Sequence, residues 1–233
     1  MLSTFLQTAA ETFEAVPVQE ELSFSLISLA AKGGWLMLVL LALSIVAIFI
    51  FGKKWWAIRQ AGRIDKNFIK DVDNYLKDGK VRSARALCKR SDTPVARMIE
   101  KGIDRIDKPL SDIRIAVENV ANVEVAKLEK GLPALATIAG GAPMIGFLGT
   151  VIGMVQAFFN MAQAGNNIDI TLLSGGIYTA MITTVGGLIV GILAYFGYNF
   201  LTAQVTGLVS QMEAASIEFL DAVQTRKENK NEA

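Results

Sequence analysis

Four threonines lie near the middle of long apolar stretches of the sequence, namely Thr150, Thr179, Thr183 and Thr184. A threonine hydroxyl can donate or accept a hydrogen bond, but it does not titrate near neutral pH. In an apolar helix it often bonds a carbonyl of its own backbone, so one threonine alone is weak evidence of function. Four of them at mid-depth favour a polar strip that faces a partner helix or a pore.

The residue types on which most enzymes depend are scarce. The chain has no histidine, which excludes a histidine base, a histidine-ligated metal and a Ser–His or Cys–His dyad within this chain. The single cysteine, Cys88, cannot form an internal disulfide, and thiolate metal sites usually need several cysteines. We therefore expect no catalytic residue, no metal site and no cofactor.

Charged residues are almost absent from the part of the chain that carries the threonines. Between Gly131 and Gln211 the only charged residue is Asp169. Proton relays in membranes ordinarily use titratable side chains. If protons move along these stretches, another subunit must supply the carboxylate that carries them.

Three apolar stretches can position these residues in a membrane. The first covers residues 34–52, close to the ~20 residues that cross ~30 Å of hydrocarbon. The second, 132–164, is too long for one bilayer thickness, and a polar turn at 165–169 separates it from the third, 170–201. These features predict an all-α integral membrane protein with three transmembrane helices, two of which extend into a cytoplasmic helical domain.

The flanking charges predict the orientation. Residues 1–33 contain one lysine and four glutamates, whereas residues 53–131 contain 19 basic and 12 acidic residues. The positive-inside rule then places 53–131 and the C-terminal helix and tail at 202–233 in the cytoplasm. In a bacterium the turn at 165–169 and residues 1–33, with an expected interfacial helix, would be periplasmic.

Local signals divide the charged region into helices. Gly79 ends one helical run, and Asp92-Thr93-Pro94 starts another with a capping side chain and a proline in the first turn. Lys108-Pro109 opens a helix that we expect to continue directly into the second span. After the third span, apolar residues recur four and three apart in a heptad seam suited to packing on another helix. The seam consists of Leu201, Val205, Leu208, Met212, Ala215, Phe219 and Ala222.

Small residues surround the threonines in both spans. In lipid, small residues let helix backbones approach closely, so they predict helix packing. The candidate packing residues are Pro143, Gly146, Gly149, Gly153, Gly187 and Gly191. Packing alone would indicate a scaffold without transport.

The two spans also resemble a known family. The stretches ALATIAGGAPMIGFLGTVIGM and GGIYTAMITTVGGLIVGILAYFGYN are similar to the core of the MotA/TolQ/ExbB proton-channel family, and within it to the three-span ExbB/TolQ branch. The resemblance implies a pentamer of this subunit around two single-span helices of the ExbD/TolR type. In the family the partner's membrane aspartate carries the proton, and ExbB-type complexes drive TonB.

The resemblance also implies roles for single residues. The family's threonine in the second span falls on Thr150 and its proline on Pro143, and the threonine of the third span falls on Thr184. Two positions depart from the enteric ExbB pattern. Thr179 stands where that pattern has glutamate, and Leu193 stands where it has proline. The first departure removes the one ionisable group from the expected pore.

The leading hypothesis is therefore an ExbB-like subunit of a proton-driven motor in the bacterial inner membrane, which energises TonB-dependent outer-membrane transport. A TolQ-like or gliding-motility stator subunit is an alternative within the family, and a non-conducting membrane scaffold is one outside it. The implied partners are further copies of the chain, an ExbD/TolR-type protein, a TonB-type protein and membrane lipids, but no nucleic acid.

Overall fold

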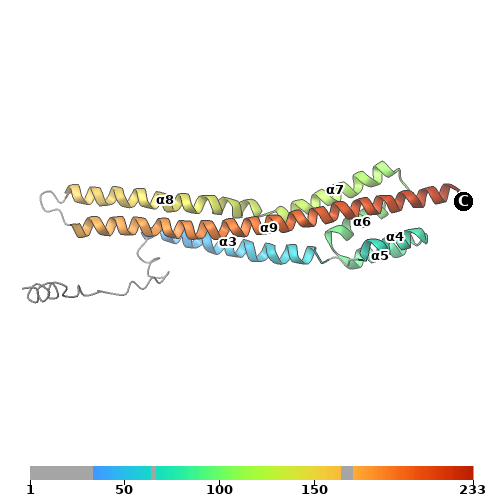
Figure 1. Cartoon of the computed structure of the whole chain (residues 1–233), viewed down its shortest axis with the longest axis horizontal. Coiled ribbons are helices and arrows are strands. Elements are labelled where there is room, and N and C mark those ends of the chain that lie inside the picture. Colours follow the sequence, from blue (N-terminus) through green and yellow to red (C-terminus); the bar gives the residue numbers. More distant parts are fainter. Residues whose placement is uncertain (1–33, 64–66, 164–169, 233) are drawn as a thin grey trace, which may run out of the picture.

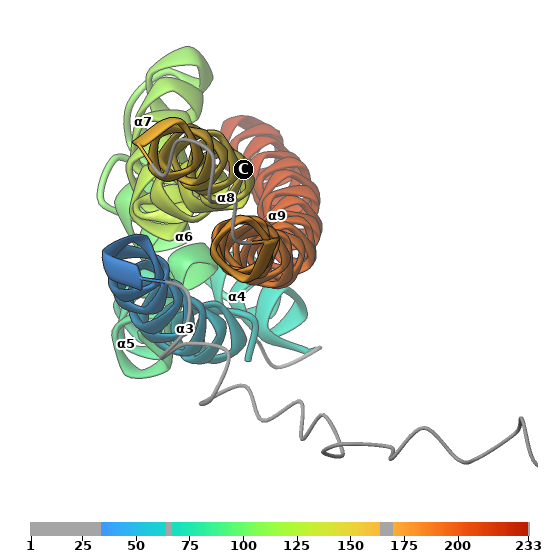
Figure 2. The same ribbon diagram turned by 90° about the vertical axis from the view of Figure 1, so that its left-hand side faces the viewer.

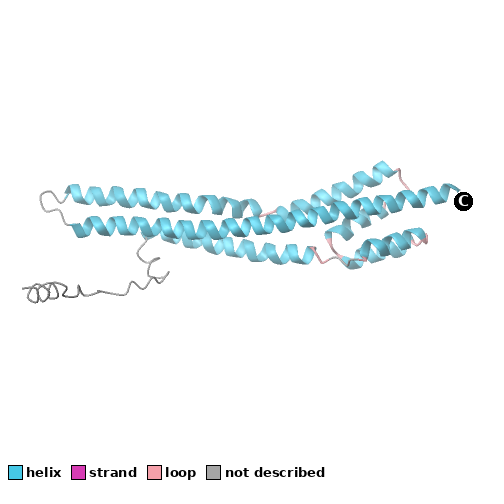
Figure 3. Cartoon of the chain, in the orientation of Figure 1, coloured by secondary structure: helices cyan, strands magenta, loops and turns pink. Residues whose placement is uncertain are grey.

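The structure is a computed structural model that describes residues 34–63, 67–163 and 170–232. Every regular element in this part of the chain is a helix (Figure 3). The interfacial helix expected within 1–33 and the turn expected at 165–169 lie outside the described residues. The helices form an elongated rod in which α8 and α9 lie side by side (Figure 1).

One half of the rod is a bundle of three apolar helices, which we call the membrane bundle. It consists of α3 (Gly34–Ala61), α8 (Leu132–Gln163) and the N-terminal half of α9 (Ile170–Glu232), and each of the three contacts the other two (Figure 2). All three are long and apolar enough to cross a membrane. The predicted fold class, an all-α protein with three membrane-spanning helices, is confirmed.

The outer faces of this bundle are covered with large apolar side chains. Met144 and Phe147 on α8 are 73% and 66% exposed, and Phe196 on α9 is 66% exposed. In water, contiguous apolar surface of this kind would drive association. In a membrane the same side chains can face lipid or another helix, which is the environment that the composition requires.

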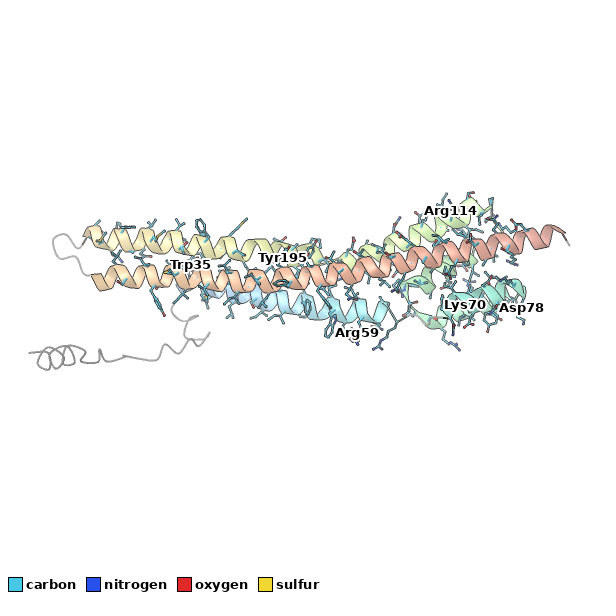
Figure 4. All side chains as sticks on the ribbon, in the orientation of Figure 1. Trp35, Arg59, Lys70, Asp78, Arg114 and Tyr195 are labelled. Atoms are coloured by element: carbon cyan, nitrogen blue, oxygen red, sulfur yellow. The ribbon has the colours of Figure 1, made fainter. Side chains whose placement is uncertain are left out.

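The other half of the rod carries most of the charge and is called here the polar bundle. It contains α4 (Phe68–Lys77), α5 (Val81–Ser91), α6 (Pro94–Ile103) and α7 (Leu110–Glu129). α4, α6 and α7 pack along the C-terminal half of α9, and α5 packs against α4 and α6. Figure 4 shows the division, because the labelled Lys70, Asp78 and Arg114 lie in this half, and Trp35 and Tyr195 lie in the other.

Two of the predicted helix boundaries are confirmed. Gly79 follows α4 with a φ of +74°, a left-handed backbone that glycine adopts without steric cost. Thr93 caps α6, since its hydroxyl accepts a hydrogen bond of 3.3 Å from the backbone N–H of Ala96. Pro94 then occupies the first turn, where its missing N–H is not needed.

The expectation that one helix runs from Pro109 straight into the second span is wrong. α7 ends at Glu129 and α8 begins at Leu132, because Gly131 between them has a φ of +96°. A left-handed residue interrupts the helical hydrogen-bond ladder. The break lies at the junction of the membrane bundle and the polar bundle.

The heptad seam of α9 packs within the subunit. All seven seam residues are buried. Those up to Leu208 pack against α3, α7 and α8, and those from Met212 onward pack into the core of the polar bundle. α9 is therefore a single continuous helix that contributes to both hydrophobic cores.

An ion-pair network fastens α6 to the end of α7. The Glu124 carboxylate is 5% exposed and accepts hydrogen bonds of 2.6 Å from Arg97 and 2.7 Å from Lys127. Burial by itself would raise the pKa of Glu124, but the bonds and charges of Arg97 and Lys127 lower it below its ordinary value. Glu124 is therefore ionised at neutral pH, close to the break at Gly131.

The buried Cys88 provides a test of the polar bundle. Burial, with a contribution from the Glu100 carboxylate, raises the pKa of Cys88 from 9.0 to about 12. Because the thiolate is the reactive form, we expect the native protein at pH 8 to react with an aromatic disulfide reagent about a thousandfold more slowly than the unfolded chain. Stopped-flow labelling before and after denaturation measures this ratio, and similar rates would contradict the packing of Cys88.

Candidate functional site in the paired membrane helices

The candidate site is built on a close antiparallel contact between α8 and α9. Small residues recur four and three apart along the facing stripes of both helices and meet in pairs. Gly146 faces Gly187, Gly149 faces Thr183, Gly153 faces Ala180, and Ala157 faces Gly176. We call these pairs the small-residue seam.

The seam brings the two backbones so close that side chains larger than hydrogen do not fit at its centre. A methyl group added at Gly187 would lie 2.6 Å from the carbonyl oxygen of Ala142 and 2.9 Å from the Cα of Gly146. A methyl group added at Gly146 would lie 2.9 Å from the carbonyl oxygen of Thr183. These neighbours are backbone atoms, so neither helix can move a side chain aside to relieve the clash.

Pro143 and Gly191 extend the contact by one turn. Pro143 has no N–H, so it cannot donate the helical hydrogen bond to the carbonyl of Ala139. A methyl group at Gly191 would lie 3.0 Å from that carbonyl oxygen and 2.5 Å from Cγ of Pro143. Gly191 therefore lets α9 cover the proline and the free carbonyl beside it.

Thr184 adds a directed hydrogen bond to the seam. Its hydroxyl donates to the carbonyl oxygen of Gly146 over 3.0 Å, from one helix to the other. The bond connects residues 38 positions apart in the chain. Thr184 is only half-buried, so it lies at the edge of the contact.

The other three threonines are placed differently. Thr183 is 2% exposed, donates to the carbonyl oxygen of Ala180 over 2.7 Å and packs against Gly149. Thr150 is half-buried and donates over 2.6 Å to the carbonyl oxygen of Phe147 in its own helix. Thr179 is also half-buried. The structure therefore brings Thr183 and Thr184 into the contact with α8, whereas the Thr150 hydroxyl bonds within α8 and Thr179 lies one turn away from Thr183 on α9.

The predicted packing residues thus share one contact with Thr183 and Thr184. Within the subunit the side chain of Thr183 belongs to the helix–helix packing. A role for any of the four threonines in lining an ion pathway remains a prediction. The candidate site contains hydrogen-bonding hydroxyls but, in the described part of α8 and in α9 before Glu213, no ionised side chain.

A known protein family matches the part of the chain that contains α8 and α9. The model of the MotA/TolQ/ExbB proton channel family matches residues 90–214, which include α6, α7, α8 and most of α9. The chain belongs to this family. The resemblance of the two span motifs is thereby confirmed, and the chain is a multi-pass membrane protein of a proton-channel family.

Individual relatives point to the ExbB branch. A biopolymer transport protein ExbB homolog of Methanothermobacter thermautotrophicus is 28% identical over 183 residues, which cover 78% of this chain and 64% of the relative. The biopolymer transport protein ExbB of Neisseria gonorrhoeae is 35% identical over 107 residues, or 46% of this chain and 48% of the relative. The chain therefore spans between about half and two thirds of the length of these relatives.

Sequence reasoning missed part of the seam. Ala142, Ala157, Gly176 and Ala180 continue the stripes of small residues on the two helices. Their spacing of four and three from the predicted glycines was a usable signal, because residues at these intervals share one face of a helix. The spacing does not show which residues of the other helix each of them contacts.

The seam predicts unequal effects for glycine substitutions in α8. Gly146→Ala would force a methyl group against the backbone of α9, so we expect α8 and α9 to separate, with a loss of stability of about 1–3 kcal/mol. Gly140→Ala is the matched control, because an added methyl group meets nothing within 4 Å there. It should be neutral or slightly stabilising, since alanine favours helix.

Thermal unfolding in mild detergent, followed by circular dichroism, compares the two variants with the unsubstituted chain. Equal melting temperatures for Gly146→Ala and Gly140→Ala would show that the backbones of α8 and α9 are not in close contact.

Proposed function

We propose that this chain is the ExbB-like subunit of a proton-driven motor in the bacterial inner membrane, where it works with an ExbD-type partner to energise TonB-dependent outer-membrane transport. The observation that carries the proposal is the seam between α8 and α9, in which hydroxyls adjoin two closely packed backbones and no titratable group is present. Membership of a proton-channel family supplies the reason to interpret that surface as part of an ion pathway.

The absence of charge in the described spans determines what the partner must supply. A hydroxyl can exchange hydrogen bonds with a carboxylate, but a mobile proton needs a group that titrates. We propose that a single-span partner presents a membrane aspartate beside Thr150 and Thr184. Thr179, in place of the enteric glutamate, makes the pathway depend on that partner residue alone.

Uncovered faces of the membrane bundle support the proposal of an oligomer. α3 packs on one side of α8 and α9, and the remaining faces of these two helices expose large apolar side chains such as Met181 and Val155. We propose a homo-oligomer, a pentamer by analogy with the family, in which α8 and α9 line a central cavity and α3 faces lipid.

The proposed orientation places the N-terminus in the periplasm and the polar bundle in the cytoplasm. We expect a cysteine at position 166 to react in intact cells with an impermeant thiol reagent, whereas a cysteine replacing the exposed Arg105 should react only after the cells are broken. Native Cys88 is buried and should not contribute to labelling. Labelling of the Arg105 position in intact cells would reverse the proposed topology.

The threonines test whether the seam serves a motor or a scaffold. Thr184→Val removes the hydrogen bond to Gly146 but keeps the shape of the side chain, so the packing at the glycines should hold. A polar partner left unpaired in a poorly hydrated cavity costs about 1–3 kcal/mol, or tenfold and more in rate. We therefore expect Thr150→Val and Thr184→Val to assemble normally and to lose proton-gradient-dependent activity, with Thr179→Val intermediate.

Thr137 provides a matched control for Thr150. Both hydroxyls bond a carbonyl of their own helix, Thr137 to Pro133 over 2.9 Å and Thr150 to Phe147 over 2.6 Å. Thr137 lies nearer the polar bundle, so Thr137→Val should retain activity. Proton uptake by vesicles that contain the chain and its single-span partner measures the effect. Full activity of a Thr150→Val, Thr184→Val double variant at normal expression would favour the scaffold.

A further inference from the structure

A group of basic residues gathers where α3 meets the junction of α7 and α8. The Lys54 ammonium on α3 donates hydrogen bonds of 3.0 Å and 3.3 Å to the carbonyl oxygens of Lys127 and Leu128 at the end of α7. A methyl group at Gly131 would lie 3.5 Å from the Cε of Lys54. This contact places the basic end of the first apolar run beside the basic start of the second.

Two more lysines flank this contact with their charges unneutralised. Lys53 and Lys130 are both exposed. Lys53 directly precedes Lys54 on α3, and Lys130 lies two residues after Leu128, whose carbonyl oxygen Lys54 bonds. Neither forms an ion pair with another described residue, whereas Lys127 is paired with Glu124. Glu129 is the one other carboxylate close by in sequence, so positive charge prevails at the junction.

The position of this group matches the edge of the hydrocarbon. The apolar run of α3 ends at Gly52, directly before Lys53, and the apolar run of α8 starts at Leu132, directly after Gly131. Trp55 and Trp56 follow at once on α3 and are 45% and 71% exposed. Indole rings and lysines both favour the level of the lipid headgroups.

We propose that Lys53 and Lys130, on the two sides of the α3–α7–α8 junction, bind the phosphate of an anionic phospholipid whose acyl chains lie along the exposed apolar face of α3. The charges are complementary, and the apolar face of α3 begins at the depth where the acyl chains of such a lipid begin. A zwitterionic lipid carries its own cation beside the phosphate and gains less from two lysines. The site depends on neither the partner nor the subunit stoichiometry of the proposed motor.

Tryptophan quenching by brominated lipids tests this site in the full chain. The chain has three tryptophans, and Trp35 lies at the far end of α3, so a Trp35→Phe background leaves the signal to Trp55 and Trp56 (Figure 4). In phosphatidylcholine bilayers, brominated phosphatidylglycerol should quench more strongly than brominated phosphatidylcholine at the same mole fraction. Lys53→Gln with Lys130→Gln should lower this preference about 25-fold, since each lysine near an anionic headgroup contributes roughly a fivefold factor.

Lys70→Gln with Lys101→Gln is the control, because both are exposed lysines of the polar bundle without an ion pair among the described residues and the change in net charge is the same. This variant should keep the preference. Inorganic phosphate, compared with chloride at equal ionic strength, should not compete, because it has no acyl chains. Equal quenching by the two lipids in the unsubstituted protein would overturn the proposal without any variant. An equal loss in both double variants, or displacement by inorganic phosphate, would overturn it as well.

Discussion

The close approach of the α8 and α9 backbones is the constraint on which the rest of this structure depends. In lipid the hydrophobic effect does not drive two apolar helices together, so their contact relies on dispersion forces and on hydrogen bonds across the interface. Both weaken steeply with distance, and only a hydrogen side chain allows the separation seen at Gly146 and Gly187. The same closeness puts the carbonyl of Gly146 within reach of the Thr184 hydroxyl. Packing and the candidate site are therefore two results of one geometry.

α9 carries the consequences of that contact beyond the membrane bundle. The helix is unbroken from Ile170 to Glu232, and its buried face changes partners near Leu208 without a change in periodicity. α8 differs, since Gly131 separates it from α7. The two halves of the subunit are thus connected by one continuous helix and by one pair of helices that is broken at Gly131.

Charged side chains supply hydrogen bonds near the helix break at Gly131. Carbonyls at the C-terminal end of a helix have no intrahelical partner, and Lys54 bonds two of those in α7. Glu124, one turn earlier, fastens the same stretch of α7 to Arg97 on α6. Side chains from α3 and α6 therefore fix the end of α7 next to the break at Gly131. The basic residues proposed to bind lipid lie at the same place.

The sequence alone determined the features that depend on local or periodic properties. The three spans follow from runs of apolar residues, and the helix boundary at Gly79 and the cap at Thr93 follow from conformational preference and side-chain chemistry that act within a few residues. The heptad seam of α9 was visible for the same reason, since a period of four and three marks one face of a helix whatever covers it. The lack of charged residues between Gly131 and Gln211, apart from Asp169, needed no structure at all.

Only the tertiary structure decided which surfaces meet. The pairing of Gly146 with Gly187, the inward direction of Thr183 and the bond from Lys54 to Lys127 join residues far apart in the chain, the last pair 73 positions apart. Small residues lie on several faces of these helices, as Gly140 does on an open one, so spacing could not select the contact. The break at Gly131 escaped prediction because glycine is also tolerated within helices, as at Gly146. Glycine adopts the helical and the left-handed backbone about equally well, so its own preference does not decide between them. In the structure Gly131 is left-handed and lies beside Lys54 and Ile50 of α3, which are far from it in the chain.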